Sequence, residues 1–370
     1  MFRPLKKRLF IWGGLTALVL TVAALLLYSA FREPRYSGKP LSEWTALLSS
    51  SKPEERQKAE QVLRGLGPDA VSELSGQVKR KSEVLGRLRD VAEKILPDRV
   101  KPKLRRYFGK GKEVNSRYAA TQALRLMGTN AHLAAPALAQ ALQDPNVLIS
   151  SAAGQALGQI GPEAVPYLVE ALNNPDYLVR ANACSALAQL GTNSAPAVPK
   201  LSEFIRDETG PIVSSAAYTL SRIGAPIIPS VTPLLSSTNW TIRRWAVYAL
   251  AFAGPTVMQA MPQVIPMLLD TNEQVRWITV TAIGKIDVTS KAAGEALLYA
   301  TRDSSSNVQI AAISELSFRP DIVIAEMPRF LEMLKDPSPA IRGQAAYALG
   351  QTGRFASNAV PALKELLADP

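Results

Sequence analysis

Apolar residues recur at helical spacing along the chain after residue 50, and no segment of useful length alternates between apolar and polar positions as a strand does. Val179, Ala183 and Leu187 are four residues apart and share one face of a helix. The small side chain of Ala183 allows a neighbouring helix to approach closely. We therefore predict an all-α protein.

Turn residues interrupt this helical pattern at a nearly constant interval of 30 to 33 residues. The predicted turn positions are Gly67, Pro97, Gly128, Gly161, Gly191, Gly224, Gly254, Asp287, Pro320 and Gly353. Such an interval is typical of solenoids built from helix pairs. A single pair cannot bury its apolar face alone, so we expect stacked pairs that share one continuous core.

Prolines indicate where each helix pair begins. Six of them lie 25 residues before the next turn position: Pro136, Pro166, Pro199, Pro229, Pro262 and Pro328. Because proline is favoured at the start of a helix, each one is predicted to open the first helix of a pair. The unit length varies only between the turn and the proline, which predicts a rigid helix pair and a connection of variable length.

The units share a motif. Its clearest copy reads Asn174-Pro175-Asp176, Val179-Arg180, Ala186-Leu187 and Gly191, and the last copy contains Ile341-Arg342 and Ala348-Leu349. This motif resembles HEAT repeats, in particular the short HEAT-like repeats of phycobilisome lyases. The resemblance covers residues 53–370, about ten helix pairs, and implies an α-α superhelix, an ARM/HEAT-like solenoid.

The N-terminus carries a different pattern. A basic flank at residues 1–8 precedes an uncharged run at residues 9–31, whose 23 residues at helical rise cover about 34 Å, enough for a bilayer core of about 30 Å. We predict a transmembrane helix there. A cleaved signal peptide is one alternative, although Tyr28-Ser29-Ala30 is a poor cleavage site, and a buried helix is another.

The charges around residues 9–31 favour a cytoplasmic N-terminus. We therefore predict a single-pass membrane protein whose solenoid is extracytoplasmic, which in a bacterium means periplasmic. Residues 32–52 are predicted to form a juxtamembrane segment. Within it, residues 36–44 resemble a segment that follows the anchor of many membrane-anchored bacterial HEAT-like proteins.

The charge of the chain is unevenly distributed. Its 42 Lys and Arg residues against 31 Asp and Glu residues give a formal net charge of +11. Residues 1–112 contain 24 basic and 11 acidic residues, whereas residues 113–370 contain 18 and 20. Because nucleic-acid binding needs charge that neutralises phosphates, we expect no nucleic acid on the solenoid. A single cysteine and a single histidine exclude an internal disulfide and a multi-histidine metal centre.

Part of the basic excess lies in one short segment. Its seven basic residues are Arg99, Lys101, Lys103, Arg105, Arg106, Lys110 and Lys112. No acidic residue interrupts them, and Tyr107 and Phe108 lie among them. Near a membrane such a segment is suited to anionic lipid headgroups. The alternatives are a solvated connection between repeats and a contact with nucleic acid.

Two charged residue types keep to fixed positions of the repeat. Arginine occupies one position, at Arg117, Arg180, Arg243, Arg276 and Arg342. Aspartate occupies another position, six residues earlier, at Asp144, Asp207, Asp270, Asp303 and Asp336. We expect a ladder of hydrogen bonds and ion pairs that ties each inter-helix loop to the next unit. A column of arginines that holds an acidic ligand is the alternative.

The exposed face of the second helices changes in the unit that ends at Gly254. Positions that are polar in an earlier unit become aromatic there, and neighbouring units add to the patch. The candidate partner-binding residues are Tyr218, Arg222, Trp245, Tyr248, Phe252, Trp277 and Ile278. Exposed aromatic residues with arginine are typical of protein interfaces, and packing as additional core is the alternative. The HEAT resemblance implies that second helices line the concave face, so the patch is expected in a groove.

No set of residues indicates catalysis. The di-iron centre of deoxyhypusine hydroxylase, a HEAT-like enzyme, needs several His-Glu pairs, and this chain has His132 alone. We expect His132 to be solvated at a helix start and Cys184 to fill a small apolar space with no activating histidine near it in sequence. The sequence also lacks a glycine-rich phosphate loop and the motifs of serine hydrolases and zinc peptidases.

We therefore predict a membrane-anchored, non-catalytic scaffold that binds other proteins and needs no cofactor and no metal. The alternative is a HEAT-like repeat enzyme of the lyase type that holds a ligand in the concave groove.

Overall fold

The computed structural model describes residues 34–79, 110–207 and 210–366. These residues form helices joined by short turns, with one small hairpin, so the prediction of an all-α fold is confirmed. The chain divides into two compact units. The first ends at Ala141 and also takes in Asn146–Ala152, and the second comprises Leu142–Pro145 and the chain from Ala153 onward.

The first unit contains the hairpin and the early helices. Its elements are β1 (Arg35–Tyr36), β2 (Lys39–Pro40), α2 (Leu41–Leu47), α3 (Pro53–Arg64), α4 (Pro68–Lys79), α7 (Lys110–Met127), η1 (Gly128–Ala134) and α8 (Ala135–Ala141). A further helix, α9 (Val147–Ile160), begins in the first unit and ends in the second.

The hairpin gives the segment at residues 36–44 a structural role. Its two turn residues, Ser37 and Gly38, both have positive φ, as the tight turn of a two-residue hairpin requires. The indole Nε1 of Trp44 donates a hydrogen bond of 2.6 Å to the carbonyl oxygen of Tyr36, and the side chains of Leu41 and Trp44 are buried. Residues 35–47, which belong to the predicted juxtamembrane segment, are thus folded onto the first unit, where α2 packs against α3 and α7.

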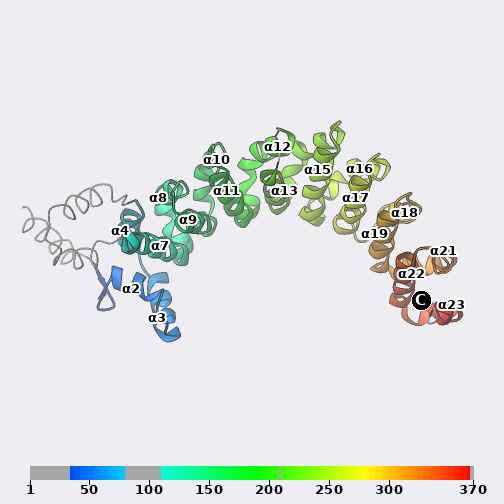
Figure 1. Ribbon diagram of the computed structural model, residues 1–370, viewed down its shortest axis with the longest axis horizontal. Coiled ribbons are helices and arrows are strands. Elements are labelled where there is room, and N and C mark those ends of the chain that lie inside the picture. Colours follow the sequence, from blue (N-terminus) through cyan, green and yellow to red (C-terminus); the bar gives the residue numbers. More distant parts are fainter. Residues whose placement is uncertain (1–33, 80–109, 208–209, 367–370) are drawn as a thin grey trace, which may run out of the picture. The chain divides into compact units, whose positions relative to one another are not determined.

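The second unit is a succession of helix pairs (Figure 1). The first helices are α10 (Val165–Ala171), α12 (Val198–Asp207), α14 (Ile228–Val231) with η5 (Thr232–Ser236), α16 (Met261–Val264) with η7 (Ile265–Leu269), α18 (Lys291–Ala300), α20 (Pro320–Ala325) with α21 (Met327–Met333), and α23 (Val360–Glu365). The second helices are α11 (Tyr177–Leu190), α13 (Pro211–Ile223), α15 (Trp240–Ala253), α17 (Glu273–Ile286), α19 (Ser306–Ser317) and α22 (Pro339–Gln351). Each second helix packs against the next, so they form one continuous layer.

In six of the described units, the connection of variable length is a 3₁₀ helix. Longer units have seven residues in it, at η1, η3 (Gly191–Ala197), η6 (Gly254–Ala260) and η8 (Gly353–Ala359). Shorter units have three, at η2 (Pro162–Ala164) and η4 (Ala225–Ile227). The glycine before or at the start of each connection has positive φ, a conformation that favours glycine. The six described prolines that were predicted to open first helices are the second residues of α8, α10, α12, α14, α16 and α21.

The turn at Asp287 has no glycine and is held by side chains instead. The Asp287 carboxylate accepts hydrogen bonds from the backbone N–H groups of Thr289 and Ser290 at 3.2 and 2.9 Å. The guanidinium of Arg319, from the next unit, donates to the carbonyl oxygens of Asp287 and Ser290. These contacts fix a turn whose backbone stays at negative φ.

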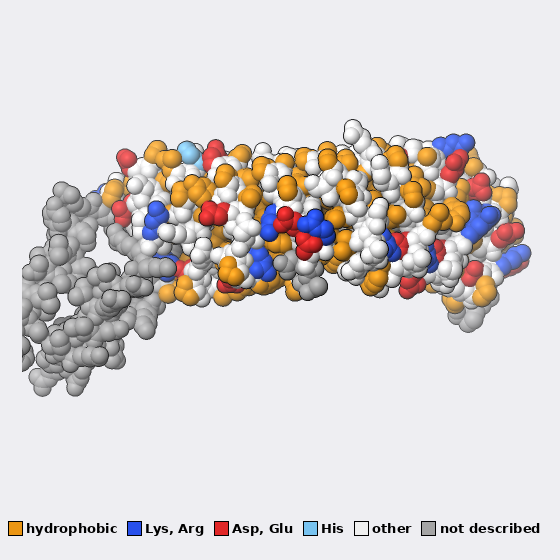
Figure 2. Space-filling view, turned by 90° about the horizontal axis from the view of Figure 1, so that it is seen from above, with side chains coloured by type: hydrophobic (Ala, Val, Ile, Leu, Met, Phe, Trp, Pro, Cys, Tyr) orange, Lys and Arg blue, Asp and Glu red, His pale blue; other side chains and the backbone are white. Residues whose placement is uncertain are grey.

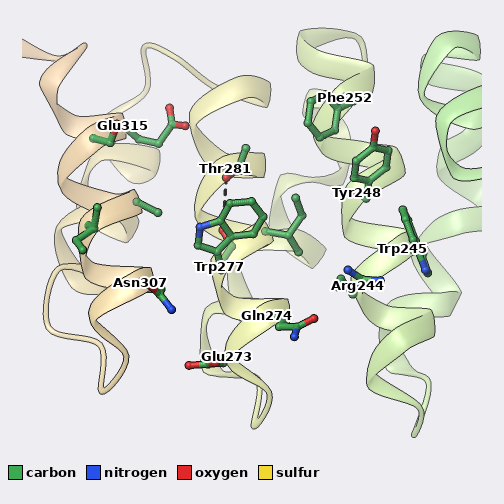
Figure 3. A pocket seen from close by; sticks show the side chains of 14 residues that line it. Arg244, Trp245, Tyr248, Phe252, Glu273, Gln274, Trp277, Thr281, Asn307 and Glu315 are labelled. Atoms are coloured by element: carbon green, nitrogen blue, oxygen red, sulfur yellow. Dashed lines mark hydrogen bonds between the residues drawn. The ribbon is translucent and has the colours of Figure 1, made fainter. Parts of the chain in front are cut away.

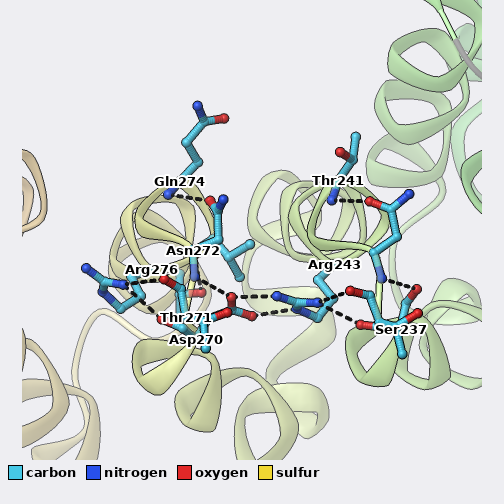
Figure 4. Close-up of polar contacts among 12 residues, drawn as sticks. Ser237, Thr241, Arg243, Asp270, Thr271, Asn272, Gln274 and Arg276 are labelled. Atoms are coloured by element: carbon cyan, nitrogen blue, oxygen red, sulfur yellow. Dashed lines mark hydrogen bonds and ion pairs between the residues drawn. The ribbon is translucent and has the colours of Figure 1, made fainter.

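Arg243 and Asp270 form one rung of the expected ladder, that is, one ion pair between successive repeats (Figure 4). Nε and Nη2 of Arg243 donate to the two carboxylate oxygens of Asp270 at 2.6 and 2.7 Å. Nη1 donates to the carbonyl oxygens of Ser237 and Thr238, in the loop before α15. The arginine and aspartate side chains are only 13% and 4% exposed. One guanidinium thus ties its own inter-helix loop to the loop of the next unit, as predicted.

Arg276 forms the next rung in the same way. It donates to the carboxylate of Asp303 at 2.7 and 2.9 Å and to the carbonyl oxygens of Asp270 and Thr271. Burial acts to raise the pKa of the Asp303 carboxyl, but the hydrogen bonds from Arg276 and from the backbone of Ser305 outweigh it, and the net pKa is lowered. The pKa of Asp270 is lowered for the same reasons, by Arg243 and the backbone of Asn272.

The ladder is incomplete at Arg180. Its Nη1 donates to the carbonyl oxygens of Asn174 and Pro175 in its own loop, both at 2.9 Å. Asp207, the aspartate at the expected position, instead pairs with its neighbour Arg206 at 2.8 and 2.9 Å and is exposed. The Nε of Arg180 is buried and has no hydrogen-bond partner among the described residues. The prediction of a rung was therefore wrong at this step, because Asp207 has a nearer arginine.

The predicted transmembrane helix at residues 9–31 lies outside the described residues. Among the helices that the structure does describe, none combines the length and the apolar character that a membrane crossing requires. The longest of them, α7, has 18 residues and carries charged side chains along its length. For the part of the chain that the structure describes, this finding overturns the prediction of a single-pass membrane protein with an extracytoplasmic solenoid. Most apolar residues of the described helices are buried between helices.

Replacing Asp270 tests the rung. Asp270→Asn is expected to lower the free energy of unfolding by about 3 kcal/mol, because it leaves a nearly buried guanidinium without its carboxylate. Asp207→Asn is the matched control, at the same repeat position but exposed and paired only with its sequence neighbour, and it is expected to leave the unfolding midpoint unchanged. Urea denaturation followed by far-UV circular dichroism measures both. Equal losses would contradict the role of the rung.

The rungs also predict how stability depends on pH. Because the pKa of Asp303 is lower in the folded chain, its contribution to stability is complete above the ordinary aspartate value of about 3.9 and is lost as the pH falls through the folded pKa. The Asp303→Asn variant should therefore be less stable than the original chain at pH 7, and the difference should shrink below about pH 4. A difference that stays constant into acid would show that the carboxylate charge does not stabilise this loop.

Candidate functional site

A groove crosses three successive second helices of the second unit, α15, α17 and α19 (Figure 3). It has a volume of about 800 Å³ and is lined by side chains from all three helices. The middle helix, α17, packs against both of its neighbours. A ligand that lies along the groove therefore meets three consecutive repeats.

The lining residues occupy equivalent positions, 33 residues apart in the sequence. Two such sets are Arg244, Trp277 and Ile310, and Tyr248, Thr281 and Ser314. Residues 244 and 277 directly follow the ladder arginines Arg243 and Arg276. Since successive residues of a helix are rotated by about 100°, the arginine reaches the rung while the next side chain faces the groove.

Aromatic side chains form one wall of the groove. Trp245, Tyr248 and Phe252 are three and four residues apart on α15, and their ring centroids are separated by 5.4 Å and then 4.5 Å. Trp277 on α17 is 46% exposed and Phe252 is 44% exposed. These rings have not been absorbed into the core, and they leave a large apolar surface open to a ligand.

The structure brings together most, but not all, of the candidate partner-binding residues. Trp245, Tyr248, Phe252, Trp277 and Ile278 all line the groove, with Ile278 largely buried beneath the other side chains. The other two, Tyr218 and Arg222, are exposed on α13 and do not line it. Whether these residues bind a partner stays a prediction.

The predicted patch did not include the residues of α19 that line the groove. These include Asn307, Ile310, Ser314 and Glu315. None of these residue types is unusual on a helix, so composition alone does not mark them. The available signal was the 33-residue register, since residues 307, 310 and 314 are the equivalents of 274, 277 and 281.

Cations already lie against the aromatic wall. The guanidinium of Arg244 is 4.5 Å from the ring centroid of Trp245 and 5.8 Å from that of Trp240. The ammonium of Lys285 is 5.3 Å from the centroid of Phe252. Cation–π contacts of this kind hold the rings in place. The Nε of Arg244 is buried and has no hydrogen-bond partner among the described residues.

Glu315 is the unusual residue of the groove. At the equivalent positions of neighbouring second helices, Ala249, Ala282 and Ala348 are fully buried. Burial raises the pKa of the Glu315 carboxyl, and the charges of Lys285 and Arg319 only partly oppose this effect. The side chain lies over Gly284, where any Cβ would collide with the carboxylate. The absence of a side chain at Gly284 thus makes room for Glu315.

Reactive side chains lie elsewhere. His132 is exposed, with its Nδ1 3.1 Å from the carbonyl oxygen of Thr129. Cys184 is buried, and burial raises the pKa of its thiol to about 12, so it is no nucleophile at neutral pH. Within the described ranges, no three His, Cys, Asp or Glu side chains converge as metal ligands.

Most of the predicted lipid-binding segment cannot be placed. Arg99, Lys101, Lys103, Arg105 and Arg106 lie outside the described residues, and Lys110 and Lys112 belong to the first turn of α7. The lipid-headgroup role of this segment stays a prediction. On the face shown in Figure 2, hydrophobic side chains are interspersed with polar and charged ones, as is usual for a protein surface.

Comparison with protein families gives a clear match. A family model of HEAT repeats matches residues 135–221, 228–317 and 294–370. These ranges include all three helices of the groove. No curated protein sequence matches the chain.

Several solved structures have a similar fold. Karyopherin Kap121p bound to the extreme C-terminus of the protein phosphatase Cdc14p is 14% identical, with a TM-score of 0.53, over 89% of this chain and 44% of that one. The Kap95:Nup1 complex is 13% identical, with a TM-score of 0.49, over 88% and 52%. The CpcE–CpcF complex of phycocyanin lyase from Nostoc sp. PCC7120 is 22% identical, with a TM-score of 0.38, over 41% and 98%. This chain thus spans about half the length of Kap121p and of the chain in the Kap95:Nup1 complex. The likeness to Kap121p, at 14% identity, shows the fold alone.

Two glycines at the same repeat position test the placement of Glu315. Gly350 on α22 has open space around it, whereas a Cβ at Gly284 would meet Glu315. Gly350→Ala is expected to raise the free energy of unfolding by about 0.5 kcal/mol through helix propensity. Gly284→Ala should gain nothing, because the carboxylate must move. Urea denaturation compares the two variants, and an equal gain at both positions would place Glu315 elsewhere.

Proposed function

The chain belongs to the HEAT-repeat family, and we propose that it is a non-catalytic scaffold that holds a segment of another protein in the groove formed by α15, α17 and α19. The observation that carries this proposal is the row of partly exposed aromatic side chains along a hollow of about 800 Å³. A contiguous apolar patch that is surrounded by polar residues is typical of a site that a partner covers, whereas single exposed rings are common.

The chemistry of the groove fits a protein ligand. Tryptophan, tyrosine and arginine are the residue types that contribute most to binding energy at protein interfaces, and Trp245, Tyr248, Trp277 and Arg244 all line this groove. Polar side chains such as Gln274 and Asn307 lie beside them. An apolar centre with polar groups around it is the usual arrangement of such an interface.

A structure with the same fold supports this proposal. The Kap121p chain is bound to the extreme C-terminus of another protein, Cdc14p. A HEAT-like array can therefore hold a terminal segment of a partner. The partner of the present chain is not inferred from that structure, because the likeness is one of fold.

The side chains of the groove also support a non-catalytic role. Its titratable lining residues are Arg244, Tyr248, Glu273 and Glu315, with neither histidine nor cysteine. Nucleophilic catalysis needs a nucleophile within hydrogen-bonding distance of a base, and no hydrogen bond joins two of these side chains. A chromophore or metal that co-purifies with the full chain would favour the alternative of a repeat enzyme of the lyase type.

Replacing Trp277 tests the proposal. The full chain and its Trp277→Ala variant are immobilised, and an extract of the source organism is passed over each. The retained proteins are identified by mass spectrometry. The affinity of each retained protein for the original chain and for the variant is then measured. Removing a central tryptophan typically costs about 2 kcal/mol, so the variant should bind the specific partner about 30-fold more weakly. Trp277 lies on the surface of α17, and far-UV circular dichroism should be unchanged.

Tyr299→Ala is the matched control for this experiment. Tyr299 is an aromatic residue on α18 that is exposed to a similar degree but does not line the groove. Its replacement should leave binding unchanged. A partner that binds both variants as well as the original chain would contradict the proposal.

A further inference from the structure

The groove offers hydrogen-bonding groups that no described residue uses. The side-chain amides of Gln274 on α17 and Asn307 on α19 line the groove at equivalent repeat positions and form no hydrogen bond with any described residue. A helix satisfies its own backbone groups, whereas an extended segment brings free N–H and C=O groups that need partners. A polyproline II segment in particular has no internal hydrogen bonds. Both amides are exposed, so they can pair with the backbone groups of an extended ligand.

The step between repeats matches the pitch of a polyproline II helix. Packed helices lie about 8–10 Å apart, so α15, α17 and α19 present equivalent positions at about this interval. A polyproline II segment repeats every three residues, or about 9.3 Å. It thus turns the same face toward each successive helix, whereas a β-strand, with a period of two residues, does not. Aromatic-lined grooves are the known receptors of such segments.

The charged residues that line the groove are Arg244, Glu273 and Glu315, and two of them mark its corners. Arg244 lies on α15 near the start of the helix, and Glu315 lies on α19 near its end, at opposite corners of the groove (Figure 3). Burial disfavours the charge of Glu315, and the charges of Lys285 and Arg319 oppose this effect only in part. None of the described residues forms a hydrogen bond or ion pair with its carboxylate. A cationic group of the ligand would supply that partner. At the other corner, the donors of Arg244 suit a backbone carbonyl oxygen.

We infer that the groove binds a proline-rich segment of the partner in the polyproline II conformation, with a Lys or Arg side chain directed at Glu315. Two steps between helices correspond to about six residues of such a segment. This inference rests on the proposed function, since it names the chemistry of the ligand in that same groove.

A display library of random nine-residue peptides, panned against the immobilised full chain, tests the inference. Peptides that bind the original chain but not the Trp277→Ala variant are sequenced. They should be enriched in proline with a three-residue period and carry Lys or Arg toward one end. A selected peptide should bind Glu315→Lys about tenfold more weakly, and changing its basic residue to Glu should restore binding to that variant. Tyr299→Ala should bind as the original chain does.

The remaining outcomes each overturn the inference. Peptides that depend on Trp277 but lack proline at every third residue would refute the inference and leave the proposed function intact. So would peptides whose binding to Glu315→Lys is not restored by changing their basic residue to Glu. The absence of any Trp277-dependent peptide would refute it as well. The proposed function is judged separately, by whether the natural partner is lost from Trp277→Ala. Far-UV circular dichroism of Glu315→Lys and of the isosteric Glu315→Gln shows that the helices are retained.

Discussion

No helix pair of this chain can cover its own apolar face, and the structure depends on the continuous interior that results when pairs stack. At one repeat position the second helices carry a small side chain, which is fully buried in each case: Ala183, Ala216, Ala246, Thr279, Ala312 and Ala345. Small side chains let successive helices approach closely, so the layer from α11 to α22 is continuous. The constraint fixes which face of each helix is inside. The opposite face is free to vary from repeat to repeat, and the groove lies there.

The arginine ladder stabilises the part of the layer that carries the groove. The rung from Arg243 to Asp270 ties α15 to the loop before α17, and the rung from Arg276 to Asp303 ties α17 to the loop before α19. Arg180, on α11 in an earlier repeat, has no such rung. The helices whose relative positions define the groove are thus the ones joined by two-pronged, largely buried ion pairs. Because each rung arginine directly precedes a groove residue, a shift at the ladder would also move Arg244 or Trp277.

How much could be predicted from the sequence depends on whether the cause is local. Helix pairs, turns and proline positions follow from backbone preferences of single residues. The structure confirms them within the residues it describes, and the predicted turn at Pro97 lies outside these. The rungs were predicted from a repeated pattern of charged residues. That Asp207 pairs with Arg206 and not with Arg180 depends on the geometry of the loop. The hairpin at Arg35–Pro40 is too short to show alternation. Residues of α19 such as Ser314 become part of a site only because the repeat places them beside Trp277. The apolar pattern at the N-terminus led to a predicted localisation that the described helices do not support.

Glu315 shows how a repeat protein acquires specificity. Its position in the repeat is one that alanine fills at 249, 282 and 348, and an alanine there would add to the buried surface without any desolvation. A half-buried carboxylate does the opposite: its burial costs free energy, which the charges of Lys285 and Arg319 only partly offset. Gly284 then gives up helix propensity to make room for it. Two neighbouring repeats thus both depart from the most stable choice at the same place. Neither departure adds to the interior, and the proposed binding of a partner in the groove gives both of them a reason. The charge of Glu315 at one end would then give that ligand a direction.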